Sequence, residues 1–156
     1  MQRLFAGLSL FLLATSTADA CTCIGLPPGE EGVRIYLDSS DLVFLGRIET
    51  VTYEDAEHRG KPYQRRIAKV VVLEGFKGVS TGDNISLLDS AHLCGLTLRE
   101  RESFLIFVSV PEDGSLPGVL GCTNFLIESP SDLVPSRASR DTSRAKQALS
   151  ILRRIS

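Results

Sequence analysis

The sequence predicts a mainly β domain, a small closed or partly closed barrel of about five strands with a helix after it. Three observations predict this fold class. Short apolar segments rich in β-branched residues recur along the chain, Gly and Pro punctuate the connections between them, and the last segment changes to a helical period. A length of 156 residues allows one domain.

The N-terminal segment, residues 1–20, has the pattern of a secretory signal peptide. Arg3 supplies the positive charge, the apolar stretch after it is too short to span a bilayer, and Ala18-Asp19-Ala20 is a small-x-small cleavage site. Cleavage there makes Cys21 the first residue of a secreted domain that spans residues 21–156. This domain is expected outside the cell, or in the periplasm of a Gram-negative bacterium.

A different processing route also exposes a cysteine. Bacterial lipoproteins are cut immediately before a cysteine that then carries lipid, which would anchor the protein to the cell envelope through Cys21. That route favours a large aliphatic residue three positions before the cysteine and a small uncharged residue two positions before it. Those positions hold Ala18 and Asp19, so the signal-peptide interpretation is preferred.

All four cysteines belong to the expected secreted domain, and an even number of cysteines in an oxidising compartment implies disulfides. A bridge between Cys21 and Cys23 would close a very tight ring. Both are therefore expected to pair with Cys94 and Cys122, in an order that the sequence leaves open. Each bridge would close a loop of about 70–100 residues and stabilise the fold by about 4–5 kcal/mol in the chain-entropy model. The N-terminus would thereby be fixed at two nearly adjacent points.

After the N-terminal cysteines we expect a Pro/Gly-rich connector, a short helix over residues 33–37 and two strands. The apolar pattern places the first strand over residues 41–52, buried on both faces at first and then half exposed. A charged turn region over residues 54–62 contains Gly and Pro. It separates the first strand from a long second strand over residues 63–76, which is rich in β-branched residues.

Three further strands are expected, over residues 84–88, 103–110 and 119–127. A loop over residues 90–96 surrounds Cys94 and follows the first of them. A Gly-rich turn separates the last two. Strands at this spacing, followed by a helix, indicate a small closed or partly closed β-barrel.

The final segment, residues 141–155, is predicted to be an amphipathic helix. Residues 137–154 carry six basic residues and one acidic residue, whereas residues 21–136 carry ten basic and seventeen acidic residues. The favoured interpretation is a helix docked on an acidic barrel. The alternative is a basic helix that meets an anionic membrane or a partner, and the small alanines and the absence of aromatic residues argue against it. The apolar stripe of this helix consists of Ala145, Ala148, Leu149, Leu152 and Ile155.

Five short motifs occur along the chain: Cys21-Thr22-Cys23, Ser40-Asp41-Leu42-Val43-Phe44-Leu45-Gly46, Cys94-Gly95, Phe104-Leu105-Ile106-Phe107 and Gly121-Cys122-Thr123-Asn124-Phe125. In this order they resemble the tissue inhibitors of metalloproteinases (TIMPs), over residues 21–133. The resemblance implies a netrin-like (NTR) domain, that is, an OB-like five-stranded barrel, with the bridges Cys21–Cys94 and Cys23–Cys122. The sequence shows no counterpart of the second domain or of the third bridge of the animal inhibitors, so we expect a minimal single-domain relative.

The resemblance also implies a mechanism. The free α-amino nitrogen and the carbonyl oxygen of Cys21 would chelate the catalytic zinc of a protease and displace its water. Thr22 would enter the specificity pocket beside the zinc. The zinc belongs to the target, so the domain itself needs no cofactor, and the expected partner of this monomeric inhibitor is a zinc metalloprotease. The contact ridge around the chelating residue would be formed by Cys23, Ile24, Ala91, His92 and Leu93.

Other functions have less support in the sequence. The main alternative is a netrin-like module that binds another protein without inhibiting it. A net charge of −2 gives no basic field for nucleic acid, and no segment after residue 20 is long enough to span a membrane. His58 and His92 lack partners at metal-ligand spacing, so no intrinsic metal site is expected. No nucleophile–base arrangement stands out, and we do not expect an enzyme.

Overall fold

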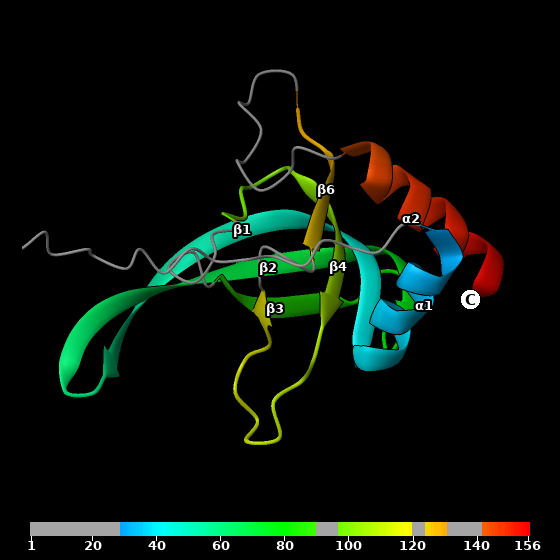
Figure 1. Ribbon diagram of the computed structural model, residues 1–156. Coiled ribbons are helices and arrows are strands. Elements are labelled where there is room, and N and C mark those ends of the chain that lie inside the picture. Colours follow the sequence, from blue (N-terminus) through cyan, green and yellow to red (C-terminus); the bar gives the residue numbers. More distant parts are fainter. Residues whose placement is uncertain (1–28, 90–96, 120–123, 131–141) are drawn as a thin grey trace, which may run out of the picture.

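The computed structural model describes residues 29–89, 97–119, 124–130 and 142–156. These residues form a six-stranded sheet with two helices packed on one of its faces (Figure 1). The protein is therefore mainly β, as the sequence predicts. The elements are α1 (Gly29–Ser39), β1 (Leu42–His58), β2 (Lys61–Lys77), β3 (Asn84–Asp89), β4 (Ser103–Val108), β5 (Gly118–Val119), β6 (Asn124–Glu128) and α2 (Thr142–Ile155).

The sheet is curled and open in the described part of the chain. Its strand order is β5-β3-β2-β1-β4-β6, and every pair of neighbours is antiparallel except β3 and β5. Three irregularities in the pairing of β1 with β2 bend these strands, because bulges increase the local twist. Val119 at one edge consequently packs in the same hydrophobic core as Phe104 and Leu126, near the other edge.

The expected strand over residues 119–127 is described in two pieces, β5 and β6, and residues 120–123 between them lie outside the described residues. β5 pairs with β3 at one edge of the sheet, whereas β6 pairs with β4 at the other edge. The described parts of the expected strand thus pair with two different neighbours in the sheet.

The charged segment over residues 54–62 is also not the turn region that the sequence suggests. β1 and β2 stay paired as far as His58 and Lys61, and only Arg59 and Gly60 form the turn. Both turn residues have a positive φ, 52° and 73°, as a type I′ turn requires. The charged residues lie on two paired strands instead of marking a loop, and Glu54 faces Arg65 across the pair. We call residues 53–65 the hairpin arm, because neither β3 nor β4 pairs with it (Figure 1).

Helix α1 is longer than the expected 33–37 segment. Two acidic residues, Glu30 and Glu31, lie in its first turn, where carboxylates interact favourably with the helix dipole. At its other end, the Nζ of Lys77 donates hydrogen bonds to the carbonyl oxygens of Leu37 and Asp38, at 2.8 and 3.2 Å. A side chain from β2 thus satisfies the last turn of the helix.

Two hydrophobic cores lie on the two faces of the sheet. β4 contributes to both, because successive residues of a strand point to opposite faces, and all six of its residues are buried. This explains its continuous apolar run. The inner core, on the side toward which the sheet curls, contains Phe44, Ile48, Val70, Leu87, Leu98, Phe104, Ile106, Val119 and Leu126, among others. The outer core, between the sheet and the helices, contains Val33, Val43, Leu105, Phe107, Leu149 and Leu152, among others.

Helix α2 is docked on the outer core, which confirms the favoured interpretation of this segment. Ile155 of the predicted stripe is half-buried, and Ile151, which the stripe did not include, is buried. No helix in the described residues is long and apolar enough to cross a membrane. The buried residues of α2 are Ala145, Ala148, Leu149, Ile151 and Leu152.

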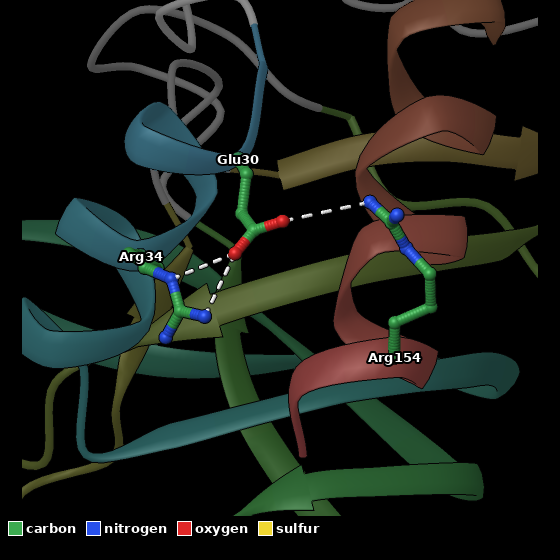
Figure 2. Close-up of polar contacts among 3 residues, drawn as sticks. All are labelled: Glu30, Arg34 and Arg154. Atoms are coloured by element: carbon green, nitrogen blue, oxygen red, sulfur yellow. Dashed lines mark hydrogen bonds and ion pairs between the residues drawn. The ribbon is translucent and has the colours of Figure 1, made fainter.

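Ion pairs join α2 to the sheet and to α1. Arg153 contacts Glu74 of β2 at 2.7 Å, and its hydrogen bonds to that carboxylate raise the pKa of the guanidinium. Glu30 of α1 lies between Arg34 of its own helix, at 2.7 Å, and Arg154 of α2, at 3.6 Å (Figure 2). These exposed pairs contribute at most about 1 kcal/mol each, so the buried stripe is the main source of docking energy.

Gly46→Ala tests how tightly β1 packs against the inner core. A Cβ at this position would overlap the side chain of Val70 and the ring of Phe44. Overpacking of this kind costs about 1–3 kcal/mol, so urea denaturation should show a lower free energy of unfolding by about that amount. Thr50→Ala, at an exposed position of the same strand, should cost less than about 1 kcal/mol. Equal small effects of the two changes would contradict tight packing at Gly46.

Candidate functional site

The residues predicted to inhibit a protease lie outside the described part of the chain. They are Cys21, Thr22, Cys23, Ile24, Ala91, His92 and Leu93. Both bridges that the resemblance implies, Cys21–Cys94 and Cys23–Cys122, lie outside it as well. The structure bears on this site through the described residues that adjoin these segments.

The residues that precede the segments 90–96 and 120–123 lie side by side. Asp89, the last residue of β3, is the register partner of Val119, the last residue of β5. The two strands are parallel, so the chain reaches both residues in the same direction. Cys94 and Cys122 therefore follow adjacent strand ends at one edge of the sheet.

The connection from β4 to β5 is fixed where it reaches this edge. The N–H of Leu88 donates to the carbonyl oxygen of Pro117 at 2.8 Å, which aligns β5 beside β3. Earlier in the connection, the N–H of Ser115 donates to the Oδ1 of Asp113 at 2.9 Å. Hydrogen bonds from Ser115 lower the pKa of the Asp113 carboxyl and so favour its ionised form.

Three residues form a buried polar contact at the end of β3, which we call the Arg66–Asp89 clamp. A guanidinium nitrogen of Arg66 lies 2.9 Å from the Oδ2 of Asp89, whose side chain is fully buried. The same carboxylate oxygen accepts a hydrogen bond from the N–H of Leu98 at 3.3 Å. The other terminal nitrogen of Arg66 donates to the carbonyl oxygen of Leu98 at 2.9 Å. Asp89 precedes the 90–96 segment and Leu98 follows it, so one contact joins both of its sides.

The clamp occupies this position because of strand periodicity. Arg66 shares the inner face of β2 with Ala68 and Val70, one repeat beyond the last apolar residue. Asp89 lies directly opposite it on β3. Strand pairing therefore places the Arg66 guanidinium against the Asp89 carboxylate where the apolar core ends.

The base of the hairpin arm also touches the clamp. The guanidinium of Arg66 lies 5.7 Å from the centre of the Tyr53 ring, within range of a cation–π interaction. Tyr53 is the cross-strand partner of Arg66 in the pairing of β1 with β2. Arg66 therefore contacts the hairpin arm, the end of β3 and the backbone of Leu98 together.

Sequence reasoning did not identify Arg66 or Asp89. A basic residue within a strand and an acidic residue at a strand end are both common on exposed surfaces, and the pattern alone does not show that they meet. The available signal is that Asp89 ends an apolar strand immediately before a cysteine-containing loop. The register between β2 and β3 is needed to find its partner.

Two polar residues of the motifs behind the resemblance have structural roles. The Oδ2 of Asp41 accepts a hydrogen bond from the N–H of Val110 at 2.8 Å, and its own N–H donates to the carbonyl oxygen of Val108 at 3.0 Å. These bonds join the start of β1 to the end of β4. Asn124, which is buried, accepts a hydrogen bond at its Oδ1 from the N–H of Phe107 at 3.1 Å. The fold accounts for both residues without reference to inhibition.

An open cavity of about 490 Å³ lies on the outer face of the sheet. Three of its lining residues, Arg47, Ser103 and Glu128, follow one another across β1, β4 and β6. The described residues contain no group of three or more His, Cys, Asp or Glu side chains that could hold a metal ion. The cavity is lined by Arg47, Leu73, Arg101, Ser103, Glu128 and Pro130.

Comparison with known proteins does not decide the family. No model of a known protein family matches the chain, and no curated protein matches it. The resemblance to the TIMPs therefore rests on the motifs and their order.

Asp89→Ala tests the energetic role of the clamp. Removing one partner of a buried ion pair leaves the other charge uncompensated, which costs about 3–5 kcal/mol. Urea denaturation should show a loss near the lower end of that range, because the Arg66 side chain keeps some contact with water. The double change Arg66→Met with Asp89→Leu should recover most of the loss.

The control is Glu54→Ala, which breaks the exposed pair with Arg65 one position along β2. It should change the free energy of unfolding by less than about 1 kcal/mol. A cost of Asp89→Ala no larger than that of Glu54→Ala would show that the clamp is not a desolvated contact.

Proposed function

We propose that the protein is a secreted inhibitor of zinc metalloproteases, built on an OB-like, netrin-like barrel. Its inhibitory group is the α-amino nitrogen and carbonyl oxygen of Cys21, exposed by removal of residues 1–20. Thr22 enters the specificity pocket of the protease. The zinc is supplied by the target, because catalytic zinc sites keep a position open for water or substrate.

The observation that carries the proposal is the parallel pairing of Asp89 with Val119. Cys21 and Cys23 are two residues apart, so their Cα atoms are separated by at most about 7 Å. Two disulfides from so short a segment require partner cysteines that also lie close together, since each bridge joins Cα atoms about 5.5 Å apart. Adjacent strands are about 4.8 Å apart, so the starting points of the two segments that carry Cys94 and Cys122 are compatible with this requirement.

Chain lengths are consistent with this arrangement. Cys122 is three residues after Val119, a reach of at most about 11 Å. Cys94 is five residues after Asp89 and four residues before Leu98, a reach of at most about 14 Å from the latter. The clamp keeps Asp89 and Leu98 together, which limits where Cys94 can lie. A dipeptide held in this way would lose little entropy when it binds a protease.

The first test is an N-terminal extension by one alanine before Cys21. The added residue moves the free amine away from the zinc and converts the Cys21 nitrogen into an amide, which is a poor ligand. Inhibition of a susceptible zinc protease should be lost, while the urea denaturation profile stays that of the wild type. An alanine added after Ser156 is the matched control and should inhibit normally. Equal inhibition by both extended proteins would exclude chelation by Cys21.

The mass of the exported protein tests the required processing. A mass that matches residues 21–156 with two disulfides is expected. A lipid adduct on Cys21 would block the nitrogen and identify an envelope lipoprotein instead. If the correctly processed protein inhibits no member of a zinc-protease panel, the remaining hypothesis is a non-inhibitory binding module.

The pH dependence of inhibition gives an independent test. A protonated amine cannot coordinate zinc, and α-amino groups have a pKa of about 8 in model peptides. Below that pH the proton competes with zinc, so the inhibition constant should rise by about tenfold for each unit of acidification. Measurements at successive pH values where the protease itself stays active would show this slope. A flat profile would contradict coordination by a free amine.

A further inference from the structure

We propose that Arg66 and Asp89 are positioning residues, which hold the backbone of Leu98 at the end of β3, and that the contact surface of the proposed inhibitor depends on this backbone position. This inference rests on the proposed function for its consequence in inhibition, but the clamp itself is a property of the described residues.

Leu98 is held in three ways. Its side chain is fully buried in the inner core, its N–H donates to Asp89, and its carbonyl oxygen accepts from Arg66. Asp89 is in turn fixed by the strand pairing with Arg66 on one side and with Val119 on the other. The two sides of the 90–96 segment are therefore joined through side chains that cannot move without exposing a buried charge.

The chemistry of the clamp favours orientation over bulk stability as its main effect. A buried ion pair is often no more stabilising than apolar side chains of similar volume, because both charges lose their hydration. Such a pair instead fixes the orientation of the groups that it joins, because the planar guanidinium donates hydrogen bonds at fixed angles to a carboxylate and a carbonyl oxygen. Arg66 uses its two terminal nitrogens for two different acceptors, Asp89 and Leu98.

Arg66 also links Leu98 to the hairpin arm. The contact of its guanidinium with the Tyr53 ring places the base of the arm against the same side chain. The arm has no strand partner beyond its own hairpin in the described structure, so this contact at its base helps to set its direction. Arg66 thus contacts both the base of the hairpin arm and the backbone of Leu98.

Arg66→Met and Arg65→Met form a matched pair of variants. The two arginines are consecutive on β2, and each makes an ion pair, Arg66 in the buried clamp and Arg65 with Glu54 at the surface. Hydrogen exchange followed by NMR should show the Leu98 amide exchanging at least about tenfold faster in Arg66→Met. In Arg65→Met its rate should be unchanged. The Asp41 amide, which donates to the Val108 carbonyl oxygen at the far end of the sheet, provides an internal reference in both proteins.

Inhibition is then measured with the same proteins. The inhibition constant against a susceptible zinc protease should rise by about tenfold or more in Arg66→Met and stay constant in Arg65→Met. Arg66→Lys retains the charge but lacks the planar fork, so partial recovery is expected. Gly46→Ala lowers global stability without touching the clamp, and its inhibition constant should match the wild type.

An unchanged exchange rate of the Leu98 amide in Arg66→Met would overturn the clamp as a positioning device. Faster exchange with an unchanged inhibition constant would overturn its role in orienting the contact surface. An equal loss of inhibition in Gly46→Ala would reduce the effect to stability and also overturn it. If the wild-type protein inhibits no zinc protease, the proposed function fails, and the exchange result still decides whether the clamp exists.

Discussion

The pairing of β1 with both β2 and β4 is the constraint on which the other elements depend. β1 and β4 separate the two cores, and successive residues such as Val43 and Phe44 point to opposite sides. The bulges in β1 curl the sheet, and curling encloses the inner core while it leaves the other face for α1 and α2. Close packing then leaves no room for a Cβ at Gly46.

Strand positions could be predicted from the sequence wherever burial produced a regular pattern. The β4 run and the α2 stripe fall into this class, since each is buried along its length or along one face. The hairpin arm could not be predicted in this way. Its residues, such as Glu54 and Arg65, are exposed although they lie on strands, and the arm is as rich in charged residues as a loop. The sequence also did not show that the described parts of the expected fifth strand pair with different neighbours, β3 and β4.

The candidate site could be predicted only in part, for a related reason. The cysteine positions and the order of the motifs point to a fixed N-terminus, and those are local features of the sequence. The Arg66–Asp89 clamp, by contrast, joins two residues that are 23 positions apart in the sequence and that meet through the register of β2 and β3. Long-range register is set by the whole sheet, so neither residue is distinguished from ordinary surface charges by its neighbours in the chain.

The clamp and the proposed disulfides would constrain different properties of the chain. A disulfide limits the distance between two segments and restricts the dihedral angle about its S–S bond, but it makes no hydrogen bond to the backbone. The Arg66–Asp89 clamp, by contrast, fixes the backbone of Leu98 through directional hydrogen bonds on both its N–H and its carbonyl oxygen. Chelation of a metal requires both distance and direction, because the lone pairs of nitrogen and oxygen must point at one ion. In the proposed inhibitor the two bridges would supply the distance, and the clamp would contribute to direction only through the backbone of Leu98, which it holds at the end of β3.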